Sequence, residues 1–376
     1  MRWVQKGFLL LCLAMGTVAA EAAVPAAGDT VYYRLSREWS LPLSDDEAPY
    51  VLRDPAPRSI PPVLLGTWVT PVGRLYLVDE ITGQLVALDP PGREVFRVGR
   101  AGEGPEEHRG SGDPLPWPGC AIARSDCVIG AKIIRYDGEG RFLDRVALQG
   151  QREYLRVLPL QDGGVGIGVT IEPGQASTME IVATLVVFDA DGEVRAEIQT
   201  GRNVLSFGTK ALRHEEDMEV IPRVATDGDR RIYVQPDPYR WEIACYDPDL
   251  HLLWRRQRDV RPLPKTGAAL AEADAEATPV YAPSRRRHVI RRLVGRPGGE
   301  LWVETDRRHD SPGVRVLERF NAGGEAVGSC RVTGRPQRAG RTAFCGDRVL
   351  WVRPADSEDL DGPFLEVYRL VPASSG

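Results

Sequence analysis

Short apolar stretches recur along most of the chain and are separated by turns rich in Asp, Asn and Gly. The clearest copy occupies residues 75–78, 84–88 and 94–98, with an Asp-Pro-Pro-Gly turn between the last two stretches. Polar and apolar residues alternate within such stretches, and β-branched and aromatic residues are frequent. Alternation with a period of two is typical of half-buried β-strands. The pattern therefore predicts an all-β chain.

A unit built from these strands recurs six times. Its most regular part is a strand that ends in an aromatic residue or Leu followed by Asp or Asn, then a Gly turn and a further strand. The six anchor residues lie 48 to 74 positions apart and are Leu88, Tyr136, Phe188, Tyr246, Phe320 and Tyr368. Such periods with strand–turn–strand content are typical of propeller blades, because each sheet can bury both apolar faces only between two neighbours. The repeat predicts a six-bladed β-propeller.

The last copy, residues 341–372, supplies only three strands before the chain ends, whereas residues 30–39 form a strand without a blade of their own. We expect this N-terminal strand to join the last blade and close the ring, which would hide the sheet edges. Residues 30–376 would then form one domain. The segment 45–62 is proline-rich and predicts a surface loop. The insertion 262–287 contains a stretch of high helix propensity at 266–277, which could be a lid over one face or a solvated excursion.

The first 22 residues are typical of a secretory signal peptide. Arg2 and Lys6 precede a short apolar run at 7–15, and small residues follow at 18–22. Removal of residues 1–22 would leave a periplasmic or secreted protein, a compartment in which disulfides persist. The later sequence contains no run of 18 apolar residues, so we predict no transmembrane segment in the mature chain.

Five cysteines follow the predicted signal peptide. Cys120 and Cys127 flank a short stretch that can be interpreted as a hairpin turning at 123–124, which would place the two thiols opposite each other and predicts a disulfide. The alternative is that both are small buried apolar residues. Cys330 and Cys345 fall in different blades, roughly 14 Å apart, beyond disulfide reach. Without a Cys-x-x-Cys spacing, no structural zinc site is predicted.

The pattern of charged residues indicates which class of ligand the protein could bind. The net charge is −5, and a negative surface argues against nucleic acid as the main ligand. Nearly all the positive charge is arginine, with clusters at 285–287, 291–292 and 307–308. These clusters could bind an anionic ligand, or they could be a solvated face balanced by nearby acids.

Residues 98–107 read Val-Gly-Arg-Ala-Gly-Glu-Gly-Pro-Glu-Glu. Together with residues 75–79 and 88–92, this stretch resembles the NHL-type repeat of exported bacterial six-bladed propellers. The specific match covers residues 66–108, and Glu106 stands where the repeat pattern prefers Gly. The resemblance implies the propeller fold and a family that contains binding modules and a few enzymes, so it implies fold more than chemistry.

The sequence identifies no catalytic residue or cofactor: Gly-x-Ser-x-Gly and His-Glu-x-x-His are absent, and the five histidines are scattered. Polar residues follow the aromatic residue of several second strands, and strand ends on one face of a ring commonly form a ligand site. The candidate binding residues are Asp79, Gln235, Glu304, Asp306 and Arg353.

Three functions are compatible with this pattern. The first is a non-enzymatic protein that binds a protein, peptide or glycan on one face of the ring. The second is a metal-dependent hydrolase of the lactonase or esterase type. The third is a domain that helps to assemble an envelope complex, which co-purification of a fixed partner would distinguish from the first. Six-bladed lactonases hold a divalent cation with a Glu, Asn and Asp set. Because asparagine is scarce in this chain, the sequence favours the binding protein.

Overall fold

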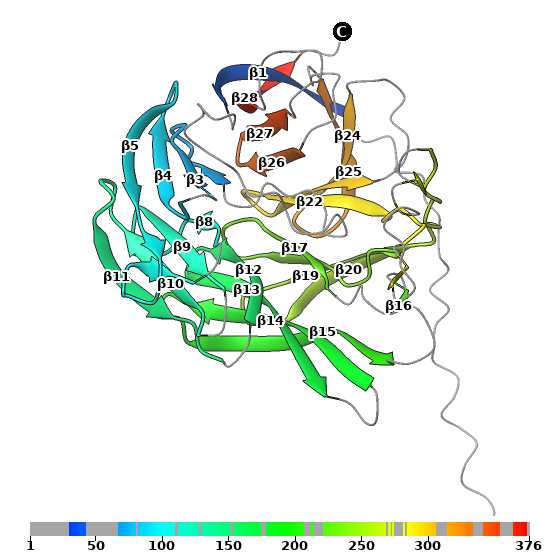
Figure 1. The fold of residues 1–376 in the computed structure, drawn as a ribbon. Helices are drawn as coiled ribbons and strands as arrows, with labels where there is room; N and C mark the ends of the chain where they lie inside the picture. The colour runs from blue at the N-terminus through cyan, green and yellow to red at the C-terminus, as the bar shows by residue number, and fades with distance from the viewer. Residues whose placement is uncertain are drawn as a thin grey trace, which may run out of the picture.

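The computed structural model describes most of the chain from Thr30 to Ala373. The described residues are 30–42, 67–79, 82–109, 112–127, 130–150, 153–173, 178–206, 212–213, 221–267, 270–271, 273, 281–282, 284–305, 314–333, 341–353 and 364–373. Nearly all of them belong to antiparallel β-sheets that are arranged around a common centre (Figure 1). The chain is therefore an all-β propeller, as the repeat predicted.

Consecutive groups of four strands form the blades, and each is numbered here in chain order. Blade one holds β2 (Thr67–Val69), β3 (Leu75–Val78), β4 (Leu85–Asp89) and β5 (Arg93–Val98). Blade two holds β8 (Pro114–Leu115), β9 (Ile122–Asp126), β10 (Lys132–Tyr136) and β11 (Phe142–Ala147). Blade three holds β12 (Glu153–Leu160), β13 (Gly163–Pro173), β14 (Thr178–Asp189) and β15 (Val194–Ser206).

Blades four to six complete the set. Blade four holds β17 (Arg223–Thr226), β18 (Ile232–Gln235), β19 (Trp241–Tyr246) and β20 (Leu252–Arg258). Blade five holds β22 (Ile290–Arg296), β23 (Glu300–Thr305), β24 (Arg315–Phe320) and β25 (Ala326–Thr333). Blade six holds β26 (Arg341–Cys345), β27 (Arg348–Arg353), β28 (Phe364–Ala373) and the N-terminal β1 (Thr30–Pro42). Two short parallel pairs lie between blades: β6 (Arg100–Ala101) with β7 (Glu107–His108), and β16 (Leu212–Arg213) with β21 (Tyr281–Ala282).

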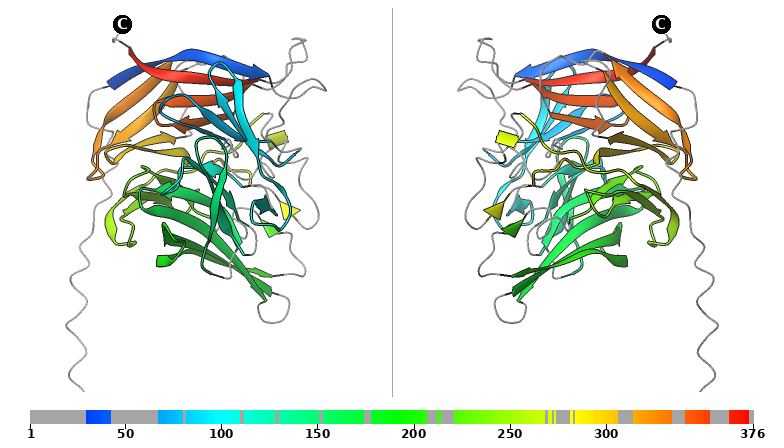
Figure 2. Two further views of the ribbon diagram at one scale, coloured as in Figure 1. Left: turned by 90° about the vertical axis from the view of Figure 1, so that its left-hand side faces the viewer. Right: turned by 90° about the vertical axis from the view of Figure 1, so that its right-hand side faces the viewer.

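The N-terminal strand pairs with the last blade, as predicted. β1 runs antiparallel to β28 from Tyr32↔Ala373 to Pro42↔Phe364, and the two strands lie side by side in both views of Figure 2. The first residues of β1 also pair in parallel with β25, from Thr30↔Ser329 to Arg34↔Thr333. This second pairing was not predicted, and it merges blades five and six into one eight-stranded sheet.

The hydrophobic core is divided among the blade interfaces. Six apolar clusters each join two consecutive blades. Tyr76 and Ile134, for example, share the cluster between blades one and two. The cluster between blades six and one contains Trp39 of β1 together with Leu350 and Leu75. The apolar contacts therefore pass from each blade to the next and return to the first.

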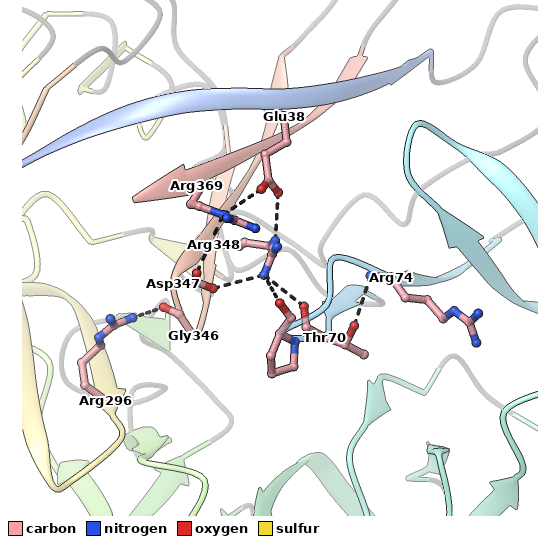
Figure 3. A network of polar contacts seen from close by, with 9 residues as sticks. Glu38, Thr70, Arg74, Arg296, Gly346, Asp347, Arg348 and Arg369 are labelled. Atoms are coloured by element: carbon pink, nitrogen blue, oxygen red, sulfur yellow. Dashed lines mark hydrogen bonds and ion pairs between the residues drawn. The ribbon is translucent and has the colours of Figure 1, made fainter. Parts of the chain in front are cut away.

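A polar network on the blade six–blade one junction accompanies this cluster (Figure 3). Arg348 is only 2% exposed, and its Nε donates to Glu38 Oε2 of β1 over 2.9 Å. Its Nη1 donates to the carbonyl oxygens of Thr70, at 3.3 Å, and Pro71, at 2.7 Å, in the turn of blade one. One guanidinium thus binds the N-terminal strand, the last blade and the first blade.

The turns after the anchor residues have the predicted chemistry. Asp137 Oδ1 accepts hydrogen bonds from the backbone N–H groups of Glu139 and Arg141, both at 2.9 Å. Asp189, Asp247 and Asn321 make the same pair of bonds in blades three, four and five. The turn then needs a residue with positive φ, a conformation that glycine adopts without strain. Gly140, Gly192 and Gly324 supply it, but Leu250 takes the place in blade four with φ of 59°.

The register of blade six differs from the sequence-based alignment of the blades. Tyr76, Tyr233 and Trp302 occupy the second strands of blades one, four and five, and each packs toward the following blade. Trp351 belongs to a similar Leu-Trp-Val sequence, yet it packs back toward blade five beside Trp302. A shift of one residue turns a strand's side chains to the opposite face. The similar sequences are therefore not in equivalent positions.

The predicted disulfide between Cys120 and Cys127 is wrong. Residues 122–126 do not turn but form the extended strand β9, so the two cysteines flank opposite ends of one strand, roughly 15–20 Å apart. Both are free thiols that pack against the cluster between blades two and three. The alternative interpretation, two small buried apolar residues, holds in part, because both pack against this cluster but are only partly buried. Cys330 and Cys345 are also free and lie in different blade interfaces, as expected.

Two further expectations concern segments outside the blades. Within the predicted helix at 266–277, the structure describes residues 266, 267, 270, 271 and 273. The last three of these are helical. The predicted loop at 45–62 lies outside the described residues. Within the described ranges, no helix is long and apolar enough to cross a membrane.

Candidate functional site

The strand order gives the propeller two chemically different faces. Because successive strands within a blade are antiparallel, the connections between second and third strands lie on the same face as the connections from one blade to the next. We call this the loop face and the opposite one the turn face. The described parts of the longer connections, residues 99–109, 112–113, 259–267 and 284–289, lie between the last strand of one blade and the first strand of the next, and so belong to the loop face. The connections on the turn face have at most six residues, as in 116–121, 137–141 and 346–347.

The four predicted binding residues that the structure describes lie at or next to strand ends on the loop face. Asp79 directly follows β3 and is 2% exposed. Its Oδ2 accepts hydrogen bonds from Thr82 Oγ1 at 2.7 Å and from Arg97 Nη1 at 3.2 Å. Glu304, in β23, is also 2% exposed and forms an ion pair with Arg315 at 3.3 Å. Both carboxylates are therefore neutralised by an arginine of their own blade.

The remaining three predicted binding residues are Gln235, Arg353 and Asp306. Gln235 ends β18 and is fully buried. Its Nε2 donates to the carbonyl oxygens of Asp237 and Arg240, both at 3.1 Å, whereas its Oε1 has no hydrogen-bond partner. Arg353 is the last residue of β27, and Asp306 lies outside the described residues. The partners described for Asp79, Gln235 and Glu304 all lie within their own blades, so no common site is formed by these contacts.

Asp126 is a buried acid that the sequence analysis missed. It ends β9 on the loop face and is 2% exposed. Its Oδ2 accepts a hydrogen bond from the Arg109 N–H at 3.0 Å, while its Oδ1 has no partner. Lys132 lies opposite on β10, and burial lowers the pKa of its ammonium group. The signal was weak because the stretch Ile-Ala-Arg-Ser before it does not resemble the apolar second strands of the other blades.

The Gly-rich stretch that resembles the NHL repeat encloses one of its own side chains. Glu107 accepts a hydrogen bond from Gly104 N–H at 2.7 Å and pairs with Arg100 Nε at 2.6 Å. A Cβ at Gly104 would lie 2.9 Å from the Glu107 carboxyl carbon, so the backbone must approach this side chain closely. The Gly104 N–H and then Arg100 lower the Glu107 pKa. The glycine loop is therefore filled by an internal carboxylate rather than open to an external anion.

A small cleft opens between blades four and five on the loop face. Its volume is about 20 Å³, and the described residues that line it are Trp241, Arg258, Val260, Arg261, Leu263, His288, Val289, Thr305 and Glu318. The Arg258 guanidinium lies 4.0 Å above the Trp241 ring and pairs with Glu318 at 2.5 Å. The cleft combines an aromatic floor, apolar walls and two arginines, which makes it the candidate functional site.

A cluster of possible metal ligands on the turn face has a simpler origin. Asp247, Asp249 and His251 offer ligand atoms that lie within 4.8 Å of one another. All three belong to one hairpin turn, in which Asp247 Oδ1 accepts the N–H groups of the other two at 2.9 and 2.8 Å. Asp249 is also paired with Arg195 of blade three at 2.9 Å. The turn geometry alone brings these side chains together.

Comparisons with known proteins found only distant similarity. No family model and no curated protein matches the chain. Among solved structures, a putative exported protein from Bacteroides fragilis is 11% identical, covers 91% of this chain and 100% of its own, and superimposes with a TM-score of 0.45. A member of a family of unknown function from Bacteroides vulgatus is 11% identical, with coverages of 92% and 100% and a TM-score of 0.45. Virginiamycin B lyase from Staphylococcus aureus is 9% identical, with coverages of 90% and 100% and a TM-score of 0.39. All three similarities are distant.

Proposed function

We propose that this chain is an exported, non-enzymatic propeller that binds a polypeptide partner on the loop face, with the cleft between blades four and five as a contact point. The cleft is the observation that carries the proposal. Its volume of about 20 Å³ is far below the roughly 300–1,000 Å³ of small-molecule pockets. A space of this size accepts the tip of one side chain, which is what a larger partner presents.

The composition of the two faces supports the same conclusion. The turn face is made of short hairpins whose polar groups bond to their own backbone. The loop face carries the longer connections, and such connections on a rigid scaffold are where binding residues concentrate. Exposed large apolar side chains among the described residues are all aliphatic. This favours a polypeptide over a glycan, because the C–H face of a sugar ring packs best on an exposed aromatic ring.

The proposal of export rests on the N-terminal pattern of residues 1–22. We propose that this signal peptide is removed and that residues 30–376 form one six-bladed domain closed by β1. The apolar cluster and the Arg348 network between blades six and one support the closure. N-terminal sequencing of the protein recovered from the periplasm or medium tests the cleavage directly.

The metal-dependent hydrolase has less support. A cation site needs carboxylates whose charge is not already neutralised. At the strand ends of the loop face, Asp79 pairs with Arg97 and Glu304 pairs with Arg315. Asp126 has no bonded arginine side chain, but it lies opposite the cationic Lys132. These positions therefore do not present the three uncompensated carboxylates that the lactonase type of site would use.

Peptide selection against the full chain tests the binding proposal. We expect a displayed random-peptide library to yield binders whose affinity falls at least tenfold when Arg261 and Leu263 on the loop face are both replaced by Ser. The matched control replaces Arg141 and Glu139 of the turn face by Ser, and it should leave the affinity unchanged. If no peptide is enriched, or if only the turn-face variant loses binding, the proposed function is wrong.

A further inference from the structure

The side chains of the cleft between blades four and five indicate what kind of group it binds. Trp241 is 2% exposed and lines the cleft, and its indole N–H is buried without an acceptor. The indole groups of Trp117 and Trp254 donate to backbone carbonyl oxygens at 3.0 and 3.1 Å. Trp39 and Trp302 also lack an acceptor, but neither of them lines this cleft. An unused buried donor costs free energy unless a ligand or water accepts its hydrogen bond.

Arg258 is held firmly in place beside this donor. Its guanidinium lies 4.0 Å from the centre of the Trp241 ring and 5.5 Å from that of Phe320. One nitrogen, Nη1, donates to Glu318 Oε2 at 2.5 Å. A guanidinium has five N–H donors in a planar fork, so this arginine keeps donors for a second acceptor. Its orientation is fixed before any ligand arrives.

Arg261 adds a second cation at the solvent side of the cleft. It is exposed and lies three residues after Arg258, in the connection between blades four and five. No hydrogen bond or ion pair is described for its side chain. The fixed charges of Arg258, Arg261 and Glu318 leave one net positive charge. A ligand with a single negative charge would balance it, whereas a doubly charged phosphate would leave one net negative charge in the cleft.

The walls of the cleft are apolar and can contact the apolar part of a ligand that carries a carboxylate. Val260, Leu263 and Val289 line it with aliphatic groups. They offer contact to the methylene groups that carry a carboxylate in an acidic side chain. Arginine and indole N–H donors together match the oxygen atoms of a planar carboxylate.

We propose that this cleft binds a carboxylate group of the partner polypeptide, either an acidic side chain or the C-terminal carboxylate. Trp241 Nε1–H and the guanidinium groups of Arg258 and Arg261 donate to its oxygens. This inference rests on the proposed function, since it names the chemistry by which the loop face recognises a polypeptide.

Sodium acetate is the probe for the carboxylate. In the ¹⁵N-labelled full chain, we expect the indole N–H resonance of Trp241 to shift saturably with acetate and not with chloride at equal ionic strength. The resonance is assigned by its loss in Trp241→Phe, or by its nuclear Overhauser contacts with Val289 if that variant does not fold. Arg261→Gln should weaken acetate binding about tenfold, the size of one charge-assisted hydrogen bond.

The matched control is Arg256→Gln, in the same strand as Arg258. Arg256 Nε donates to Gly324 O at 2.7 Å on the turn face, so its loss should leave the acetate response unchanged. Three results would overturn the inference: no saturable shift of Trp241, an unchanged affinity in Arg261→Gln, or a stronger response to phosphate than to acetate. If selected peptides still bind the loop face while acetate has no effect, the carboxylate inference fails and the proposed function stands.

The two sources of the carboxylate can be separated with selected peptides. An amidated C-terminus should abolish binding if the C-terminal carboxylate is recognised. Replacement of one internal Asp or Glu by its amide should abolish binding if a side chain is recognised. Peptides that tolerate both changes would contradict a carboxylate contact altogether.

Discussion

Glycines in the turn-face hairpins meet two separate constraints, a positive φ and close contact with a neighbouring blade. Gly140 has φ of 83°, and a Cβ there would lie 2.5 Å from the Phe96 ring of blade one. Gly228 has a similar φ of 78°, but a Cβ at that position would have no neighbouring atom within 4 Å. The two positions therefore allow backbone strain and packing to be measured apart.

We predict that Gly228→Ala lowers the free energy of unfolding by about 1 kcal/mol, the strain of one left-handed residue. Gly140→Ala should lower it by roughly a further 1–3 kcal/mol, because the added methyl group overpacks the blade interface. Urea unfolding followed by tryptophan fluorescence measures both. Equal losses in the two variants would mean that contact with Phe96 is unimportant.

Glu107 makes the Gly-rich loop sensitive to acid. Its pKa is lowered from an ordinary value near 4.5 by the Gly104 N–H and by Arg100. A depressed carboxyl pKa adds stability that is complete above the unfolded-state value and is lost as the pH falls through the folded-state value. We therefore predict that Glu107→Gln removes part of the acid destabilisation of the wild type below about pH 4.5. Urea unfolding at several pH values between 3 and 7 measures the slopes, and parallel pH profiles for both proteins would contradict the prediction.

At the scale of single elements, the extended strand β9 keeps the thiols of Cys120 and Cys127 too far apart to form a disulfide. Its extended backbone separates Cys120 from Cys127, so no oxidising compartment can join them without unfolding the blade. Burial raises the pKa of Cys127, Cys245 and Cys330 to about 12 and that of Cys345 to about 11. Thiolates, the reactive form, are therefore rare at neutral pH.

We predict that iodoacetamide at pH 8 labels Cys120 first and labels the other four described cysteines only after addition of denaturant. Cys120 and Cys127 are both only partly buried, and burial raises the pKa of both thiols, but it is the pKa of Cys127 that reaches about 12. Mass spectrometry of the labelled peptides measures the order. A peptide pair that joins Cys120 to Cys127 in a non-reduced digest would contradict the strand assignment.

At the scale of the whole molecule, the junction of blades six and one has to hold the two ends of the chain together. Arg348 is the central residue there, because it bonds to Glu38, to Thr70 O and to Pro71 O while almost fully buried. Arg369 pairs with the same Glu38 at 2.8 Å but has a 47% exposed side chain. The two arginines thus share one partner and differ in burial.

We predict that Arg348→Gln lowers the free energy of unfolding by roughly 2–4 kcal/mol, because it leaves buried acceptors without donors. Arg369→Gln should cost less than about 1 kcal/mol, as solvent-exposed ion pairs usually do. Urea unfolding of both variants tests the difference. If Arg369→Gln is the more damaging change, Arg348 is not what fastens the first blade to the last.

The amino-acid sequence by itself determined the strands, the repeat and the closing role of the N-terminal segment. These features are local: anchors such as Tyr136 and Phe188, the Asp-x-x-Gly turns after them, and an unpaired strand at 30–39 can be read from periodicity and turn chemistry. A sheet with two apolar faces must be covered on both sides, so strands of this kind indicate a ring of blades.

Only the tertiary structure decided which side of a blade each residue faces and which polar groups meet. Trp351 looks equivalent to Trp302, yet a shift of one residue turns it toward the preceding blade. Cys120 and Cys127 were placed on a hairpin that is a strand, and the buried Asp126 was missed. The cleft joins Trp241, Arg258 and Glu318 from two blades. Contacts of this kind depend on register and on distant neighbours, which a pattern with a period of two does not specify.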